Sequence, residues 1–358
     1  MNNIFLVKSP LQLLNAIEAK HYFKLDDKEC CLLIMGDRKS YSQTMRLVID
    51  SQQWSNVVLL SRVGLLAGDP WSGCDGFDDI DQLRKTLLRS SFFSIQRLNR
   101  LARAIKDVQY IFVGDNNNPL MRHFVNSLDH QYTVLLDDGT ATLGVARQRM
   151  EGKVTRKPNR ISKRVRLALK RIFQRLNDRQ PESVVFFTAY NVPVRDNDRV
   201  ITNDFTYLRS RALCSKVTDT VYFLGSPLSE AGFMTEDSYL DYIKRVRKYY
   251  AERNILYISH RRESQEKLGK IKDNYGLDIA CFEFPVEYQL ALAGPRPVEL
   301  ASFISSAVDN CRLIFGDRMK IVAFRVNKIN SDKRDIVNEI YKNYELSVGD
   351  DFIVETDF

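Results

Sequence analysis

Short apolar runs that alternate with longer helical patterns are the feature of this sequence that most restricts its fold. The runs before residue 140 are NIFLV, ECCLLIM, NVVLL, YIFVG and YTVLL. Between them lie segments such as PLQLLNAIEAKHYF, in which Leu13, Ile17 and their neighbours recur at helical spacing. Strands and helices that alternate in this way predict a parallel sheet covered by helices.

The same alternation starts again near residue 216. The order is TVYFLG, a helix over about 236–252, ILYISH and DIACFEF, a helix around ELASFISSAV, the strands CRLIF and KIVAFRV, and a last helix in DKRDIVNEIYKNYE. The fold class we predict is therefore α/β, with two Rossmann-like domains facing a cleft. The domains expected are 1–210, with a basic insertion at about 151–180, then 216–330, and a helical tail at 331–358.

Neither a basic leader with a cleavage site nor a run of 18 apolar residues occurs in the sequence. We therefore expect a cytoplasmic protein. Its six cysteines show no CxxC spacing, and the adjacent Cys30 and Cys31 lie in an apolar stretch. Buried, reduced thiols are the simpler interpretation of such a pair.

The formal net charge of +8 comes from one segment. Residues 153–175 contain many lysines and arginines and no acidic residue. Apolar residues recur there at helical spacing, in the order Ile161, Val165, Leu169, Ile172 and Leu176. A cationic helix of this kind is typical of peripheral association with an anionic membrane surface. A solvated basic loop, or a helix packed on the protein, is the alternative.

The ends of the apolar runs are where functional residues are expected, because ligands bind beyond the carboxyl ends of the strands in open α/β sheets. Asp137, Asp138 and Gly139 follow the run YTVLL. Two neighbouring carboxylates can differ in pKa, so that one serves as a general base. A simple strand-end turn explains Asp-Gly equally well.

A histidine, His260, directly follows the apolar run of the second array in YISHRRE. Arg261 and Arg262 come next, and such a cluster suits an anionic leaving group. With a reference pKa of about 6.5, a histidine can protonate a phosphate whose second pKa is about 6. A structural histidine is the alternative.

Weaker signals occur at three other places in the second array. Ser305 and Ser306 could hold a phosphate, although serines at a helix start are usually caps. Glu287, just after a strand, could accept hydrogen bonds from ribose hydroxyls. Gly225 and Ser226 form the turn FLGSP after the first strand of this array.

Metal and dinucleotide chemistry are disfavoured by the motifs. The triplets 79–81 and 196–198 have the pattern Asp-x-Asp, but neither follows an apolar strand, so we interpret them as solvated loop acids. GxGxxG, a Walker loop and HExxH do not occur in the sequence. With only four histidines, a histidine-rich metal site is not expected.

Taken together, these motifs resemble those of the bacterial lipooligosaccharide sialyltransferase family and related bacterial sialyl- and polysialyltransferases. The family's acidic–acidic–Gly motif, His-Pro motif and serine pair correspond to residues 137–139, to His260 and to residues 305–306. The segments FLGSP and FPVEYQLALAGPRPVELASFISS are also similar, and the likeness is strongest over 222–326. Arg261 replaces the proline of the family motif, and Leu228 stands where one member has an aspartate.

The resemblance implies a fold of glycosyltransferase B type and a metal-independent reaction that inverts the anomeric centre. The expected donor substrate is CMP-sialic acid, with no cofactor, and the acceptor is a glycan such as lipooligosaccharide at the inner face of the inner membrane. Asp137 or Asp138 would be the base and His260 the acid. The donor would be held by Gly225, Ser226, Arg261, Glu287, Ser305 and Ser306.

Other readings stay open. Some relatives transfer other sugars, so CMP-Kdo or a UDP-sugar are alternative donors. A non-catalytic protein that binds anionic lipid or nucleic acid would also explain the charge, although we expect no nucleic-acid partner. A homodimer is one of the assemblies that we consider.

Overall fold

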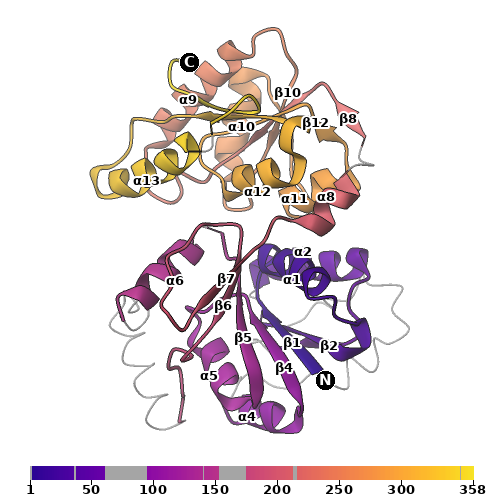
Figure 1. Ribbon diagram of the computed structural model, residues 1–358. Helices are drawn as coiled ribbons and strands as arrows, with labels where there is room; N and C mark the ends of the chain where they lie inside the picture. Colours follow the sequence, from indigo (N-terminus) through magenta and orange to yellow (C-terminus); the bar gives the residue numbers. More distant parts are fainter. Residues whose placement is uncertain are drawn as a thin grey trace. The chain divides into compact units, whose positions relative to one another are not determined.

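The computed structural model describes residues 2–35, 38–60, 95–139, 141–152, 175–212, 216–346 and 348–358. It divides into two compact units, Met1–Asn203 (unit 1) and Asp204–Phe358 (unit 2). In each unit, helices connect the strands of a parallel sheet (Figure 1).

The sheet of unit 1 has the strand order β3-β2-β1-β4-β5-β6-β7 among the described residues, and every neighbouring pair is parallel. Its central strands are apolar and buried, as expected for a sheet that is covered on both faces. The strands are β1 (Asn2–Val7), β2 (Cys30–Ile34), β3 (Val57–Leu59), β4 (Val108–Val113), β5 (His130–Leu136), β6 (Val185–Thr188) and β7 (Arg199–Thr202).

The helices of unit 1 begin at clear sequence signals. Ser9 caps α1 by accepting a hydrogen bond from the backbone of Gln12, and Asn118 caps α5 in the same way. Each of these two caps is followed by a proline, which suits the first helical turn. The helices are α1 (Pro10–Tyr22), α2 (Arg38–Ser51), α4 (Ile95–Ala104), α5 (Pro119–Ser127) and α6 (Ala141–Met150), with a short turn η1 (Asp27–Glu29).

The main sheet of unit 2 has the order β11-β10-β9-β13-β14-β15, again parallel throughout. The strands β8 and β12 form a separate, two-stranded parallel sheet. The strands are β8 (Val217–Thr218), β9 (Val221–Leu224), β10 (Ile255–Ile258), β11 (Asp278–Ala280), β12 (Arg296–Pro297), β13 (Glu299–Ser302), β14 (Lys320–Phe324) and β15 (Phe352–Glu355).

The helices of unit 2 also follow local signals. Thr235, Ser264 and Ser305 cap the helices α9, α10 and α12. The helical elements are α8 (Thr206–Ala212), α9 (Glu236–Tyr249), α10 (Gln265–Tyr275), α11 (Val286–Tyr288), η2 (Gln289–Ala293), α12 (Ser306–Phe315), η3 (Gly316–Arg318), η4 (Ser331–Lys333) and α13 (Arg334–Glu345).

The two main sheets have the same strand order. The strands of unit 1 are counted along the chain from β1, and those of unit 2 from β9, leaving out β12. The shared order is the doubly wound order 3-2-1-4-5-6, to which unit 1 adds β7. The direction of winding reverses between β1 and β4 in unit 1 and between β9 and β13 in unit 2. Ligands bind at such switch points, beyond the carboxyl ends of the strands. The two Rossmann-like sheets predicted from the sequence are confirmed.

One predicted strand and one predicted helix are wrong. The run CRLIF lies in α12, and the helix expected around ELASFISSAV is the strand β13 followed by the start of α12. All four residues of β13 are buried, so the strand shows no alternation that would distinguish it from a helix. The new helix starts where Ser305 accepts a hydrogen bond from the backbone N–H of Ala307.

The domain limits differ slightly from those expected. Helix α8, placed in the first domain by the limit at 210, packs against α12 and η2 of unit 2. The tail 331–358 supplies α13 and also β15, which pairs with β14 in the main sheet. It is therefore part of unit 2, because its strand completes that sheet.

Candidate functional site

The carboxyl ends of the central strands of unit 1 carry a connected set of polar residues. Lys8 follows β1, Asp115 follows β4, and the Lys8 ammonium forms an ion pair with the Asp115 carboxylate. Gln12 of α1 is fully buried beside them. A side chain at Gly114 would have its Cβ 2.5 Å from the Gln12 Oε1 atom, so only glycine allows β4 to end this close to α1.

Asp137 is buried, with only 3% of its surface exposed. One carboxylate oxygen accepts a hydrogen bond from the Thr188 hydroxyl, and the other accepts one from the Ala189 backbone N–H at 2.7 Å. Burial raises the pKa of Asp137 to about 6, although these hydrogen bonds oppose the shift. Asp137 therefore joins the end of β5 to the end of β6, and both of its oxygens are engaged.

Asp138 is only half buried. Its Oδ1 atom accepts a hydrogen bond from Gln12 Nε2 at 2.7 Å, and its backbone N–H donates to the Thr142 hydroxyl. The Gln12 amide is oriented by its other end, because Gln12 Oε1 accepts from the Lys8 backbone N–H at 2.9 Å. The two neighbouring aspartates thus have different surroundings.

A small pocket lies at the carboxyl ends of β4 and β5. Asp138 lines it, whereas Asp137 does not. Its lining combines polar side chains with apolar ones, as ligand pockets usually do. The lining residues are Val113, Gly114, Asp115, Asn116, Asn117, Leu135, Leu136, Asp138, Ala141, Thr142, Val145 and Phe186. The buried Oδ1 atom of Asn117 has no hydrogen-bond partner in the structure.

In unit 2, the turn after β9 is packed tightly against the turn after β10. A Cβ at Gly225 would lie 2.4 Å from the Glu263 Oε2 atom and 2.6 Å from the Tyr257 hydroxyl, so this position must be glycine. Ser226 is buried, and its hydroxyl donates to the backbone carbonyl of Ile304 at 2.7 Å. Because Ile304 precedes Ser305, the FLGSP turn is held against the start of α12.

His260 lies just beyond β10 and is half buried. Its Nδ1 atom accepts a hydrogen bond from the Arg262 backbone N–H at 3.2 Å. In a neutral ring the hydrogen is then on Nε2, which leaves Nε2 as a donor. Burial, with contributions from Arg262 and Arg261, lowers the pKa of His260 to about 4. The ring is therefore neutral near pH 7, whereas its reference pKa had suggested a protonated general acid.

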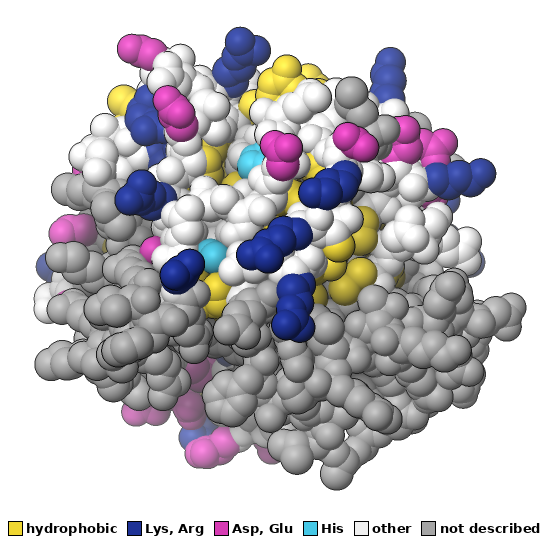
Figure 2. All heavy atoms as spheres, turned by 90° about the horizontal axis from the view of Figure 1, so that it is seen from below, with side chains coloured by type: hydrophobic (Ala, Val, Ile, Leu, Met, Phe, Trp, Pro, Cys, Tyr) yellow, Lys and Arg dark blue, Asp and Glu magenta, His cyan; other side chains and the backbone are white. Residues whose placement is uncertain are grey.

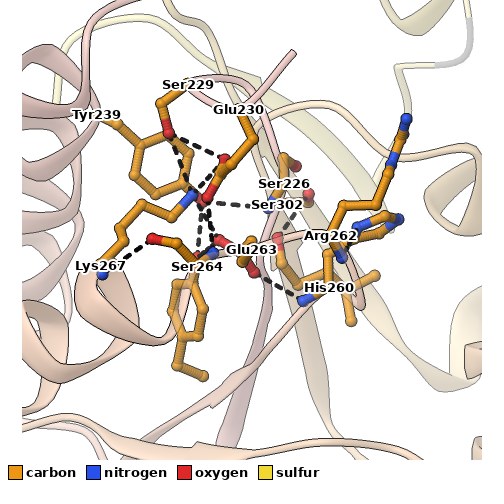
Figure 3. Close-up of polar contacts among 12 residues, drawn as sticks. Ser226, Ser229, Glu230, Tyr239, His260, Arg262, Glu263, Ser264, Lys267 and Ser302 are labelled. Carbon is orange, nitrogen blue, oxygen red and sulfur yellow. Dashed lines mark hydrogen bonds and ion pairs between the residues drawn. The ribbon is translucent and has the colours of Figure 1, made fainter.

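The His260 loop rests on a buried charged cluster, which Figure 3 shows. Glu263 lies between His260 and Lys267 (Figure 3). Its Oε2 atom accepts from the His260 backbone N–H at 2.6 Å, and its Oε1 atom accepts from the Tyr257 hydroxyl at 2.6 Å. Lys267 forms ion pairs with both Glu263 and Glu230, each at 2.9 Å.

Ser305 and Ser306 lie at the start of α12, and both are half buried. The Ser305 hydroxyl caps the helix, as the alternative interpretation expected. Its backbone is fixed by Tyr344, whose hydroxyl donates to the Ser305 carbonyl at 3.0 Å and accepts from the Ser305 N–H at 3.1 Å. The N-terminus of a helix favours an anion, because its first N–H groups have no partner within the helix.

The remaining donor-side candidates have contrasting surroundings. Glu287 is buried on α11, and its Oε1 atom accepts from the Asn310 side chain at 2.7 Å. Burial raises the pKa of Glu287. This contact joins α11 to α12. Arg261 is exposed next to His260.

In the triplet 196–198, Asp196 is exposed, as the sequence interpretation expected, whereas Asp198 is buried, which corrects that interpretation. Asp198 is 5% exposed and forms ion pairs with Arg149 at 2.7 Å and Arg195 at 3.0 Å. A buried carboxylate needs such partners, and it ties α6 to the turn before β7. The triplet 79–81 lies outside the described residues. Within the described ranges, no group of three or more His, Cys, Asp or Glu residues is placed to hold a metal ion.

The basic segment also lies outside the described residues for most of its length, at 153–174. Among the described residues of the protein, lysine and arginine side chains lie beside apolar side chains on the face shown in Figure 2. None of the helices within the described ranges combines the length and the apolar character needed to cross a membrane. Of the adjacent pair, Cys30 is buried as predicted, whereas Cys31 is only partly buried, and both are free cysteines.

The sequence does not match any protein-family model or any curated protein. Solved structures do match. A 2,6-sialyltransferase of Photobacterium sp. JT-ISH-224, in a ternary complex with CMP and lactose, superposes with a TM-score of 0.50 at 11% identity. The match covers 99% of this chain and 78% of that one.

Two other similar structures are more distant. The glycosyltransferase B domain of a sialyltransferase from Photobacterium damselae has a TM-score of 0.47 at 11% identity, covering 99% of this chain and 100% of that one. The E. coli heptosyltransferase WaaC with ADP has a TM-score of 0.41 at 10% identity, covering 90% and 86%. The two doubly wound sheets and the likeness to the 2,6-sialyltransferase together define the fold class as the two-domain glycosyltransferase B type.

Some residues of the site were not found from the sequence. Asp115 follows the run YIFVG, so the strand-end rule that selected Asp137 and His260 would also have selected it. Gln12, Thr188 and Lys267 carry no comparable signal. Each lies far along the chain from the group that it contacts, or on a helix whose inward face cannot be recognised from the sequence.

Proposed function

We propose that this protein is an inverting, metal-independent glycosyltransferase. It transfers sialic acid, or a related CMP-activated sugar, to a hydroxyl of a cell-surface glycan such as lipooligosaccharide. The observation that carries the proposal is the arrangement at the switch point of unit 2. There a neutral histidine with a donor Nε2–H and an exposed arginine follow β10, a helix N-terminus follows β13, and these two strands flank β9.

On the acceptor side, Asp138 is the base in this proposal. It lines the pocket, and Gln12 holds one of its oxygens at 2.7 Å. The acceptor hydroxyl gives its proton to Asp138 as its oxygen attacks the anomeric carbon of the donor. Asp137, whose two oxygens bind Thr188 and Ala189, is a positioning residue that fixes the end of β5.

On the donor side, the bond from the anomeric carbon to the phosphate oxygen breaks, and negative charge grows on the CMP phosphate. His260 stabilises that charge by donating a hydrogen bond from Nε2, and Arg261 adds positive charge nearby. The N–H groups at the start of α12, with Ser305 and Ser306, hold the phosphate, and Glu287 accepts from the ribose. Fixed donors of this kind stabilise a leaving phosphate without a cation.

The donor class is tested by a scan of CMP-sialic acid, CMP-Kdo and UDP-sugars for hydrolysis, transfer and thermal stabilisation. We expect a rise in melting temperature with CMP and turnover of a CMP-sugar, and no change in turnover after addition of EDTA. Turnover of UDP-sugars alone would replace the donor in this proposal, and loss of activity with EDTA would contradict metal independence. If no sugar nucleotide binds, a non-catalytic role is favoured.

We also propose peripheral association with an anionic membrane through residues 156–176, since a lipid-linked acceptor would be found there. The support is the spacing of Ile161, Val165 and Leu169 beside many cationic residues. Flotation with anionic liposomes should recover the full chain, and deletion of 156–176 should abolish recovery. Neutral liposomes are the control, and unchanged binding by the deletion variant would contradict the proposal.

A further inference from the structure

We infer that Glu263 is a positioning residue for His260: its buried carboxylate holds the His260 loop so that Nε2–H faces the donor phosphate. This inference rests on the proposed function of His260, which Glu263 serves without touching the substrate. Glu263 was not singled out by the sequence patterns, and the mechanism above does not use it.

The contacts of the Glu263 carboxylate reach both turns of the donor side. Its Oε2 atom accepts from the backbone N–H of His260 at 2.6 Å, which fixes the start of the loop. The next turn of the same loop then places the Arg262 N–H on His260 Nδ1. A Cβ at Gly225 would lie 2.4 Å from the same Oε2 atom, so the β9 turn also rests on this carboxylate.

Glu263 is itself held rigidly. Its side chain and that of Lys267 are both fully buried, and the ion pair between them joins the loop to α10. The Tyr257 hydroxyl donates to Glu263, and the Tyr239 and Tyr257 hydroxyls are 2.7 Å apart. Lys267 also lies over the Tyr239 ring at 4.1 Å and pairs with Glu230.

A carboxylate is the right group for this place. One Glu263 oxygen accepts from a backbone N–H, and the other accepts from a hydroxyl and an ammonium. A charged side chain that only accepts hydrogen bonds can make all three contacts. A buried ion pair is weak evidence for stability, because desolvation offsets its attraction. Its role here is to fix the geometry of the His260 loop, to which Glu263 is bonded.

The test compares Glu263→Gln with a matched control, Glu266→Gln. Glu266 lies in the first turn of α10, just after the His260 loop, is largely exposed, and pairs with Lys270 at 2.9 Å. The first readout is nitrogen-15 NMR of the histidine rings in the free protein, with the His260 signal identified by its loss in His260→Gln. We expect the Nε2–H tautomer in wild type and Glu266→Gln, and a mixture of tautomers in Glu263→Gln.

The second readout is turnover with the donor. Glu263→Gln should lower kcat by about 10²-fold, the effect of a misplaced catalytic group, with a much smaller change in the KM of the donor. Glu266→Gln should stay within about twofold of wild type. If Glu263→Gln does not fold, Tyr257→Phe, which removes one donor to Glu263, should show the same change of tautomer with a smaller loss of kcat.

The outcomes separate this inference from the proposed function. A folded Glu263→Gln variant that keeps the wild-type tautomer and turnover overturns the inference. An unaltered tautomer in Tyr257→Phe, where Glu263→Gln is unfolded, also overturns it. A wild-type protein that turns over no sugar nucleotide overturns the proposed function instead, whereas the tautomer measurement still decides whether Glu263 positions the ring.

Discussion

His260→Ala should lower kcat by roughly 10²–10³-fold, the usual range for loss of one hydrogen-bond donor to a developing charge. The KM of the donor should change much less, because the hydrogen bond strengthens mainly in the transition state. His260→Gln keeps an N–H donor and should retain more activity than His260→Ala. Initial rates at saturating donor, with CMP binding measured separately, provide the comparison.

The pH dependence distinguishes a neutral His260 from a protonated one. Its lowered pKa, about 4, means that the ring is neutral from about pH 6 upward in the free protein. The profile of kcat/KM, which reports the free enzyme, should therefore show no titration of His260 between about pH 6 and 8. A rate that increases as the pH falls through about 6.5, and that loses this dependence in His260→Gln, would show that the imidazolium is required. Near-normal turnover by His260→Ala would remove His260 from the mechanism.

Asp138→Asn should lower turnover by roughly 10²–10⁴-fold, because an amide cannot accept the proton of the acceptor hydroxyl. The Gln12 contact and the shape of the pocket are nearly preserved by this change, so the unfolding temperature should move little. Initial rates and thermal unfolding are measured on the same preparations. Asp129→Asn, an exposed acid before the opposite end of β5, is the control and should behave as wild type.

Asp137→Asn should lower the stability more than Asp138→Asn does, and the turnover less. In this variant the side-chain NH2 group would point at either the Ala189 N–H or the Thr188 hydroxyl. A buried donor left without a partner costs about 1–3 kcal/mol of unfolding free energy. Because the pKa of Asp137 is raised from 3.8 to about 6, the folded protein binds a proton that the unfolded chain releases between these values. This contribution to stability is lost as the pH rises through about 6, and Asp137→Asn should remove that dependence. A larger loss of turnover in Asp137→Asn than in Asp138→Asn would reverse the two roles.

Local signals in the sequence were sufficient for the two sheets. Apolar runs such as NIFLV and ILYI must be buried on both faces, and helical segments between them force parallel pairing, so β1 and β10 could be predicted. Caps such as Ser264 and Ser305 mark helix starts through contacts two or three residues away. The prediction failed where burial removed the alternation of polar and apolar residues, as in β13. The short and mostly exposed strand β7 was not predicted.

The sequence also determined which strand ends carry acids and the histidine, since that depends only on where each apolar run stops. The division of roles between Asp137 and Asp138 was decided by tertiary structure alone. Thr188 and Ala189, about fifty residues along the chain, occupy one carboxylate, and Gln12 orients the other. The neutral state of His260 has the same origin, because burial and the neighbouring guanidinium groups set its pKa only once β10 lies within the sheet. Contacts between distant segments fix these properties, and no local pattern encodes them.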